Sequence, residues 1–468
     1  MSERPGASVT VRDLEKIAGG DPRQIVDLVE SFAEDHSVEH RQTLDLNAAH
    51  SLLSPRVKAI MGSDLVESSQ AGEDASTESL DRAQALLSEL GKKLFDVPYV
   101  EYRPASGAQA NGLFFLGAMK SGDAVMALSA KNGGHYTYQS VSYPGAYGLD
   151  ITEVPCDGDD YPTVNLELLA DELERVRPKW LTVGGATMLF PYQLREIADM
   201  VQGVGGRIHY DGAHILGLAA SGVFQDPLHE GASVMTGSTQ KTLSGPLGGL
   251  ILMHDEDVSE ALNSRIPTFI ASFANNRTVA LALTMAEHLA FGKDYSTGVA
   301  SNALALSRAL DSEGFRLPGK DLGFTQSHVV LVDLEPTPHK ADSVNVLRRA
   351  GIISSLAAVP STYPEKRALR LGSPVCTKKG MGEGEMAEIA RLLRRVLLEG
   401  EEPEAVGTDV AALVASFPNV QYCFCFAIHA RAPCRRSMLR LTCIALLIRS
   451  SRRRIRARSC VSPEETFS

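Results

Sequence analysis

The chain has 468 residues, enough for two or three domains with substantial buried cores. Its net charge of -11 at pH 7 argues against general nucleic-acid binding, and its 44% hydrophobic content is ordinary for a soluble globular protein. The polar N-terminus lacks the apolar run of a secretory signal, and no apolar stretch approaches the roughly 20 residues that span a bilayer. We therefore expect a cytoplasmic protein that has no membrane partner.

Helical and strand patterns alternate between residues 80 and 290. Helical apolar spacing marks residues 79–95 and 166–176, and short strand-like apolar runs occupy 124–129, 180–184 and 207–211. This alternation predicts an α/β fold with a mostly parallel sheet flanked by helices. Loops at the carboxyl ends of the strands would then hold a ligand.

The pattern changes after residue 295. A helix around 299–314, a strand at 329–334, and helices near 341–350 and 384–400 predict a smaller α+β domain. We expect four regions in total: an N-terminal arm (1–40), a large domain (41–295), a small C-terminal domain (296–420) and a tail (421–468).

The tail is rich in arginine and cysteine. It carries runs such as SRRRIRARS, and five of the seven cysteines of the chain lie in it. One interpretation is a basic arm that binds RNA or a membrane. We favour a disordered or non-native end, because nothing upstream shares this composition. The cysteine spacing matches no zinc pattern, so we expect free thiols and no metal site.

Two Gly-containing turns are candidate ligand contacts. Residues 104–111, PASGAQAN, precede a helical pattern, and a small turn at a helix N-terminus presents backbone N–H groups to a phosphate. His135 follows Gly133 and Gly134 just after a strand, where its ring is able to stack on an aromatic cofactor. Each turn alone has a structural alternative, namely a tight helix cap and a hydrogen-bonded core histidine.

Two further motifs carry reactive groups. Asp211 ends a strand and precedes His214, and an Asp in that place pairs with a pyridinium nitrogen or caps the next helix. Lys241 lies in GSTQKTLSGPLGG (237–249), among small hydroxyl residues and before a Gly-rich turn. This setting suits an amine that exchanges between a cofactor and a substrate. The alternative is a solvated surface lysine, and the presence of Asp211 upstream weakens it.

In their order, these motifs resemble those of the serine hydroxymethyltransferases, fold-type I enzymes that use pyridoxal 5′-phosphate (PLP). Members read P-H-S-G-S-Q-A-N, G-G-H-L-T-H, D-M-A-H-I, T-T-T-H-K-T-L-R-G-P-R-G-G and L-R-I-G-T-P. This chain reads PASGAQAN, GGHYTY, DGAHI, GSTQKTLSGPLGG and LRLGSP. The resemblance covers residues 40–400 and implies the PLP-dependent transferase fold of type I with PLP as cofactor.

The resemblance also implies roles for individual residues. Lys241 would form the Schiff base with PLP, Asp211 would pair with the pyridine nitrogen, and His135 would stack on the ring. Arg370 would bind the substrate carboxylate with two parallel hydrogen bonds. Further cofactor contacts would come from Ser106, Gly107 and Ala108 at the phosphate, Thr187 and His214 near the ring oxygen, Gln240 beside the lysine, and Gly248 and Gly249 at a neighbouring subunit's phosphate. Each site would be built across subunits of a homodimer or homotetramer.

The chain departs from this family in the groups that handle folate. The A-S-E-N-F motif reads AAHSL over 48–52, so His50 replaces a Glu, and the R-Y-Y-G-G motif is missing. The folate-contacting N-K-N loop reads SLA over 355–357, and two arginines of the Lys motif are Ser244 and Leu247. A site built to hydrogen-bond a pterin binds it far more weakly once those groups are lost.

Two further strings resemble the L-threonine transaldolases of natural-product pathways, such as antibiotic biosynthesis. GFTQSH over 323–328 is similar to their G-F-T-Q-T-H, and FGKDY over 291–295 is similar as well. This resemblance implies that L-threonine is cleaved to acetaldehyde and a glycyl–PLP quinonoid. The glycyl unit would then attack an acceptor aldehyde, such as a nucleoside or sugar aldehyde, and form a β-hydroxy-α-amino acid. His50 and His135 are the candidate proton carriers and catalytic histidines, together with His214.

Three alternatives stay open. A serine or α-methylserine hydroxymethyltransferase would depend on tetrahydrofolate, and a simple threonine aldolase would release glycine without any acceptor. A catalytically silent PLP-fold protein would lack the yellow cofactor chromophore. Retention of Lys241, Asp211 and Arg370 together argues against the silent protein.

Overall fold

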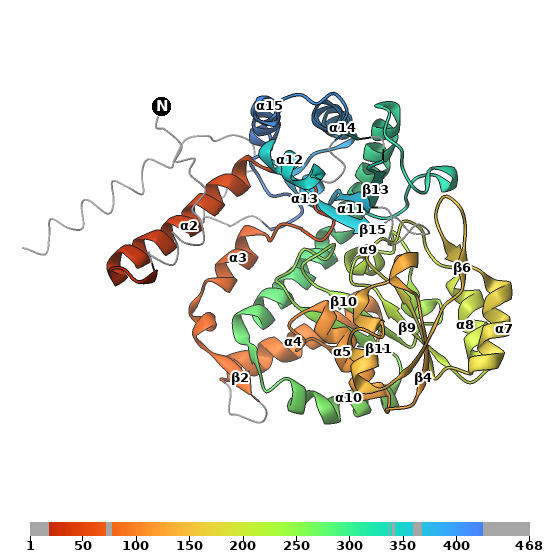
Figure 1. Ribbon diagram of the computed structural model, residues 1–468. Coiled ribbons are helices and arrows are strands. Elements are labelled where there is room, and N and C mark those ends of the chain that lie inside the picture. The colour runs from red at the N-terminus through yellow and green to blue at the C-terminus, as the bar shows by residue number, and fades with distance from the viewer. Residues whose placement is uncertain (1–17, 72–76, 336, 339–341, 359–366, 425–468) are drawn as a thin grey trace, which may run out of the picture. The chain divides into compact units, whose positions relative to one another are not determined.

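The computed structural model describes residues 18–71, 77–335, 337–338, 342–358 and 367–424 (Figure 1). They belong to one compact unit, Met1–Cys425. Residues 1–17 of the expected N-terminal arm lie outside the described residues. So does the tail beyond residue 424, with its expected disorder and most of its cysteines.

A seven-stranded sheet forms the centre of the large core (Figure 1). Its strands, in spatial order, are β3 (Tyr99–Glu101), β11 (Gly249–Met253), β10 (Val234–Ser238), β9 (Arg207–Asp211), β8 (Trp180–Gly184), β4 (Ala124–Ala127) and β5 (Asp150–Glu153). The strands from β10 to β5 run parallel, whereas β11 is antiparallel to both of its neighbours. The expected α/β fold with a mostly parallel sheet is therefore confirmed.

The register of this sheet brings the ends of three strands together. Asp211 at the end of β9 pairs with Gly184 of β8 on one side and with Thr236 of β10 on the other. Every residue of β8 and β10 is buried, as expected for parallel strands covered on both faces. The loops that follow these strands therefore start from one rigid edge.

Helices flank the sheet, and they include both helices expected from apolar spacing. They are α4 (Glu78–Phe95), α5 (Gly107–Ala118), α6 (Tyr143–Tyr147), α7 (Leu166–Val176), α8 (Leu194–Gly203), α9 (Leu216–Ala220) and α10 (Glu256–Phe269). In α7 the periodic residues Leu169 and Leu173 are buried, and the Asn165 side chain caps the helix by accepting from the Leu168 amide at 2.9 Å. Because α5 packs on β10 and β11, its N-terminus lies at the carboxyl edge of the sheet.

One long helix, α11 (Asn275–Ser312), passes through the boundary expected at residue 295. Figure 1 shows it in green, and its N-terminal part packs against α4. The helix expected at 299–314 is the C-terminal part of α11. The large hydrophobic cluster reaches Val299, and the second one begins at Ala303 on the same helix, so both cores share this element.

The smaller core contains the α+β elements expected after residue 295. An antiparallel sheet has the order β13 (Val329–Asp333), β16 (Arg367–Gly372), β15 (Ser355–Ala358). Its helices are α12 (Ser343–Arg349), α13 (Pro374–Lys379), α14 (Glu383–Leu397) and α15 (Pro403–Ala415). The expected strand at 329–334 and the helices near 341–350 and 384–400 are confirmed within a few residues.

The N-terminal segment crosses to the smaller core. After α2 (Pro22–Gln42), β1 (Leu44–Asp45) pairs in parallel with β14 (Ile352–Ile353), and α3 (Pro55–Met61) follows. The Gly372 amide donates to the Leu46 carbonyl at 2.7 Å, which places residues 46–52 beside β16. The remaining short pairs are β2 (Ser69–Ala71) with β12 (Ser272–Ala274) and β6 (Cys156–Asp157) with β7 (Thr163–Val164).

No helix in the described part of the chain is long and apolar enough to span a membrane. Within the same residues, no cluster of three or more His, Cys, Asp or Glu side chains could hold a metal ion. Cys156 and Cys376 are free thiols.

Candidate active site

Most of the predicted site residues line one cavity at the carboxyl edge of the central sheet. The cavity lies between the ends of β9 and β10, the loops after β4 and β8, and the N-terminus of α5. It is lined by Ser106, Gly107, Ala108, Asn111, His135, Gly185, Asp211, Ala213, His214, Ser238, Gln240 and Lys241. The four residues of this lining that sequence reasoning did not select are Asn111, Gly185, Ala213 and Ser238.

The N-terminus of α5 forms one end of the cavity. Ser106 caps the helix, because its Oγ accepts from the Gln109 amide at 3.1 Å. A Cβ on Gly107 would lie 2.2 Å from Ser238 Oγ, so only glycine fits between the helix and β10. The amides of Gly107 and Ala108 lie at the positive end of the helix, an arrangement that binds a phosphate group.

Asp211 is held in place by two hydrogen bonds. Its Oδ2 accepts from Asn111 Nδ2 at 2.9 Å, and its Oδ1 accepts from the Ala213 amide at 3.0 Å. The other Asn111 contacts are Thr137 Oγ1, at 2.7 Å from its Nδ2, and the Thr236 hydroxyl, which donates to its Oδ1. This buried network orients the carboxylate, since each polar atom of the amide has a partner. Asn111 is the last residue of the PASGAQAN motif, which was the signal that could have identified it.

Lys241 follows β10 and is nearly enclosed by the protein. Burial lowers the pKa of its ammonium to about 8, with the nearby Arg370 acting in the same direction and Asp211 opposing it. A substantial fraction of such an amine is uncharged near neutral pH, and the uncharged form is the nucleophile. The Lys241 side chain therefore has the electrostatic setting expected of a Schiff-base lysine.

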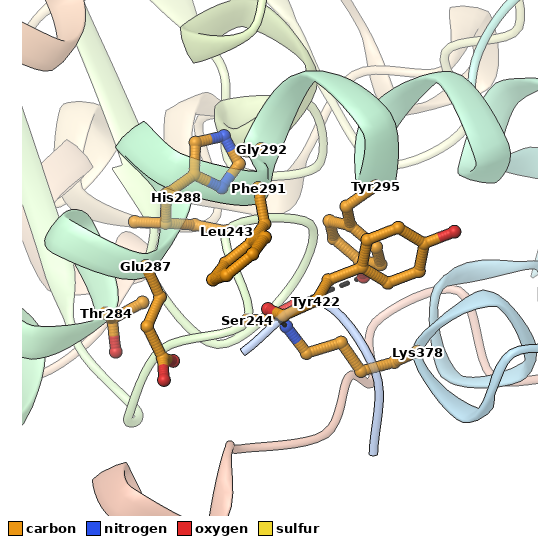
Figure 2. A pocket seen from close by; sticks show the side chains of 10 residues that line it. All are labelled: Leu243, Ser244, Thr284, Glu287, His288, Phe291, Gly292, Tyr295, Lys378 and Tyr422. Carbon is orange, nitrogen blue, oxygen red and sulfur yellow. Dashed lines mark hydrogen bonds between the residues drawn. The ribbon is translucent and has the colours of Figure 1, made fainter. Parts of the chain in front are cut away.

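The turn after Lys241 is fixed by side chains that lie far away in the sequence. Ser244 has a left-handed backbone, with φ 62°, and its amide donates to the Lys241 carbonyl at 3.0 Å. Its hydroxyl is 2.6 Å from Ser51 Oγ and 3.1 Å from the Tyr295 hydroxyl. Figure 2 shows Ser244 beside Tyr295, which in turn lies against Lys378 and Tyr422. Ser244, which stands where the Lys motif of the family has an arginine, thus holds this turn in place through its hydrogen bonds.

The two predicted histidines of the cavity are both uncharged near neutral pH. Burial lowers the pKa of His135, and its Nδ1 is 2.9 Å from Thr137 Oγ1. Burial also lowers the pKa of His214 well below its ordinary value, with Lys241 and Arg370 adding to the effect. The Nδ1 of His214 is 3.3 Å from His328 Nε2.

Arg370 projects from the middle strand of the small sheet toward this edge. Its Nη1 donates to the Ala186 carbonyl at 3.1 Å, and its Nε donates to Ser355 Oγ at 3.2 Å. No ion pair to Arg370 is found among the residues that the structure describes. Burial lowers the pKa of its guanidinium, so a bound carboxylate would supply the missing opposite charge.

The remaining predicted residues lie outside the cavity lining. Thr187 is buried on the loop after β8, and His50 lies on the N-terminal segment with its side chain 49% exposed. His50 Nδ1 is 2.8 Å from Asp45 Oδ2, a hydrogen bond that raises the pKa of the imidazole. Gly248 and Gly249 are buried behind the phosphate end, and a Cβ on Gly249 would lie 2.3 Å from the Ser106 carbonyl oxygen. Close packing within the chain thus requires glycine at that position.

Several features of the cavity fit PLP. Two buried oxygens at the site, Gln240 Oε1 and Thr187 Oγ1, have no hydrogen-bond partner among the described residues. An unpaired buried polar atom is costly, so these atoms indicate places for ligand groups. The helix N-terminus suits the phosphate, the Asp211 carboxylate suits a protonated ring nitrogen, and Lys241 supplies the amine.

Comparisons with known proteins agree with this geometry. The serine hydroxymethyltransferase family model matches residues 23–393. The serine hydroxymethyltransferase of Methanocella arvoryzae is 35% identical over 413 residues, covering 86% of this chain and 96% of the relative. The one from Thermococcus kodakarensis is 33% identical over 417 residues, with 86% and 96% covered.

Among solved structures, the L-threonine transaldolase from Pseudomonas fluorescens superposes with a TM-score of 0.78 and 24% identity. The match covers 88% of this chain and 96% of that one, and it supports the fold. The matched residues contain the whole cavity described above. The chain therefore belongs to the serine hydroxymethyltransferase family and is a PLP-dependent transferase of fold type I.

Proposed function

We propose that the chain is an L-threonine transaldolase. It would cleave L-threonine to acetaldehyde and transfer the glycyl unit to an acceptor aldehyde, forming a β-hydroxy-α-amino acid. One observation carries the proposal: the positions that would contact folate in the family are here bonded within the chain. Ser355 accepts from Arg370, Ser244 contacts Ser51 and Tyr295, and His50 pairs with Asp45.

These internal contacts weigh against a folate site. A hydroxyl already hydrogen-bonded to Arg370 or to Tyr295 offers less to a pterin. The string GFTQSH over 323–328, similar to the transaldolase branch, points in the same direction. The structurally similar protein from Pseudomonas fluorescens is itself an L-threonine transaldolase.

PLP, when bound, withdraws electrons from the α-carbon of an amino acid and so permits its Cα–Cβ bond to break. The residues that would hold it are Ser106, Gly107 and Ala108 at the phosphate, Asp211 at the ring nitrogen, His135 at the ring face, Thr187, His214 and Gln240 at the remaining polar atoms, and Lys241 as the amine.

The residues of the chain divide the remaining tasks among them. Arg370 would bind the threonine carboxylate by two parallel hydrogen bonds and so fix which bond of the α-carbon lies across the ring. Asp211, held by Asn111, would keep its negative charge next to the ring nitrogen. Lys241, with its pKa lowered to about 8, would give up and regain its bond to the cofactor in each cycle.

We propose His135 as the base for the β-hydroxyl proton of threonine. It lines the cavity, and its lowered pKa leaves the imidazole uncharged and able to accept a proton near neutral pH. His50 lies outside the cavity lining, and its bond to Asp45 raises the pKa and favours the charged form. His50 would then act as a positive group near the substrate rather than as the base.

The test is acetaldehyde release from L-threonine by the purified holoenzyme, with and without an added aldehyde acceptor. A parallel assay uses L-serine with tetrahydrofolate. Acetaldehyde release together with a new β-hydroxy-α-amino acid supports the proposal. Turnover of the serine–folate pair alone would make the chain a divergent hydroxymethyltransferase, the second candidate, which the names of its curated relatives favour. Steady glycine formation without an acceptor would make it a simple threonine aldolase.

We also propose a cytoplasmic homodimer or homotetramer in which Gly248 and Gly249 approach the phosphate of a neighbouring subunit. Gly249 is the first residue of β11 and lies close to the Ser106 carbonyl, and Gly248 immediately precedes it. Light scattering of the holoenzyme would measure the mass against the 50.3 kDa of one chain. A monomer that retains full activity would contradict the shared site.

A further inference from the structure

His328 lies outside the lining of the candidate active site but contacts His214, which is part of that lining. It is fully buried, immediately before β13, at the end of the string GFTQSH. Its Nε2 is 3.3 Å from His214 Nδ1 and 3.1 Å from the Ala48 carbonyl oxygen. One ring nitrogen thus contacts both a residue of the cavity and the segment that carries His50.

The contacts of this nitrogen determine where its proton lies. A carbonyl oxygen only accepts, so His328 Nε2 carries a proton and donates it toward Ala48. His328 Nδ1 is buried and has no hydrogen-bond partner among the described residues, as expected for a nitrogen without a proton. Burial lowers the pKa of His328 to about 3, which excludes the doubly protonated ring near neutral pH.

The same proton constrains the neighbouring ring. His214 Nδ1 faces an N–H group, so it must accept, and the single proton of the uncharged His214 ring lies on Nε2. The two ring planes are within 17° of each other, and their centroids are 5.4 Å apart. The Nε2–H group of His214 is therefore not used in the contact with His328, and it remains available to a ligand in the cavity that His214 lines.

The loop before β13 holds His328 rigidly. Ser327 Oγ donates to the Met188 carbonyl at 2.6 Å and accepts from the Val329 amide at 3.1 Å. The Gln326 amide donates to the Leu189 carbonyl at 2.9 Å. These bonds attach the loop to the segment after β8, which also carries Thr187. The imidazole of His328 is thereby fixed to the same edge of the sheet as the cavity.

We propose that His328 is a positioning residue that selects the tautomer of His214, so that His214 presents an N–H donor to the oxygen of the bound cofactor. The proposal requires PLP at His214 but not the transaldolase reaction. Acetaldehyde release and the tautomer of His214 are separate measurements, so that either can fail without the other. Because Ala48 shares the proton, the N-terminal segment is part of the same arrangement.

The test is nitrogen NMR of the holoenzyme labelled with ¹⁵N-histidine, in which protonated and unprotonated ring nitrogens have separate shifts. His214→Asn identifies the His214 signals. In the wild type, Nε2 of His214 should be protonated and Nδ1 not, without change between about pH 6 and 8, since its lowered pKa keeps the ring uncharged. The other titratable and charged groups facing His214 are Lys241, Arg370, His135 and His328.

Two variants separate positioning from packing. His328→Leu should cause loss of the single His214 tautomer, whereas His328→Gln should retain it, because the amide NH₂ is able to donate to both partners. His288→Leu removes another buried imidazole, one that does not contact His214, and should leave the His214 signals unchanged. The cofactor absorbance spectrum should shift in His328→Leu and not in His328→Gln.

A wild-type His214 with its proton on Nδ1 would overturn the proposal. So would a folded His328→Leu holoenzyme, verified by its thermal transition, with unchanged His214 signals. If His328→Leu does not fold, the wild-type shifts and the His328→Gln spectrum still decide.

Discussion

The two sides of the candidate active site are held by different kinds of contact. The sheet side, comprising Ser106–Asn111, Asp211–His214 and Ser238–Lys241, rests on the carboxyl edge of the central sheet. The closing side, comprising Ala48–Ser51, Gly323–His328, Ser355 and Arg370, consists of segments brought in from the smaller core and the N-terminus. In the proposed function the sheet side would provide the groups for the cofactor, and the closing side would provide those that distinguish substrates.

The difference also explains what could be predicted from the sequence. On the sheet side Asp211, His214 and Lys241 each lie within a short motif near the end of a strand, so local pattern was enough to predict that they meet at one cavity. On the closing side the important contacts join residues far apart, such as Ser51 with Ser244 and Ala48 with His328. No local pattern specifies such pairs, and only the fold reveals them.

The fold itself was largely predictable, because buried strands and amphipathic helices have strong periodicity. Strands at 180–184 and 207–211 and the helix at 166–176 are found at the expected residues. The long helix α11 was not recognised as one element, because its N-terminal half is buried on several faces and lacks a simple apolar stripe. The Asn111 network was missed because the motif marks the helix cap and not the amide that supports Asp211.

The largest effect is expected on the sheet side. Lys241→Ala should abolish both the PLP chromophore that borohydride reduces and threonine cleavage, since no other described lysine lines the cavity. Absorbance after dialysis and acetaldehyde release measure the two properties. Lys379→Ala is the control, because it removes a partly buried lysine that lies outside this cavity. A Lys241→Ala protein that keeps a reducible chromophore would exclude the proposed role.

A smaller effect is expected for the substrate anchor on the closing side. Arg370→Lys should lower kcat/KM for L-threonine about 100-fold, mostly through KM, because a point charge replaces a two-pronged contact with the carboxylate. The cofactor spectrum should be unchanged. Arg367→Lys, on the exposed start of the same strand, is the control. Equal losses in the two variants would mean that the change acts through the strand and not through the substrate.

The pH dependence of cofactor binding tests the electrostatics of the sheet side. Lys241 must be uncharged to bond to PLP, and its pKa is lowered to about 8. The uncharged fraction, and with it the rate of PLP uptake by the apoprotein, should rise roughly fivefold from pH 7 to pH 8 and level off above pH 9. A rate that keeps rising toward pH 10.5, the ordinary range of lysine, would show that burial does not control this amine.

The smallest effect is expected for Ser355, whose hydroxyl contacts the Arg370 guanidinium. Ser355→Ala removes the hydroxyl that accepts from the Arg370 guanidinium and donates to the Arg370 carbonyl. KM for threonine should rise about fivefold, the equivalent of roughly 1 kcal/mol. Initial rates at several threonine concentrations measure it, with Leu356→Ala as the neighbouring control. Gain of tetrahydrofolate-dependent serine turnover in Ser355→Ala would contradict the role given to this strand.

The central claim, transfer of a glycyl unit to an aldehyde, is tested most directly by following the α-carbon of threonine. The holoenzyme is incubated with L-threonine ¹³C-labelled at Cα and phenylacetaldehyde, without folate, and the products are analysed by mass spectrometry. A transaldolase yields acetaldehyde and a new β-hydroxy-α-amino acid that carries the label. Label found only in glycine would contradict the claim. So would a second incubation, supplied with methylene-tetrahydrofolate, in which the label enters only serine.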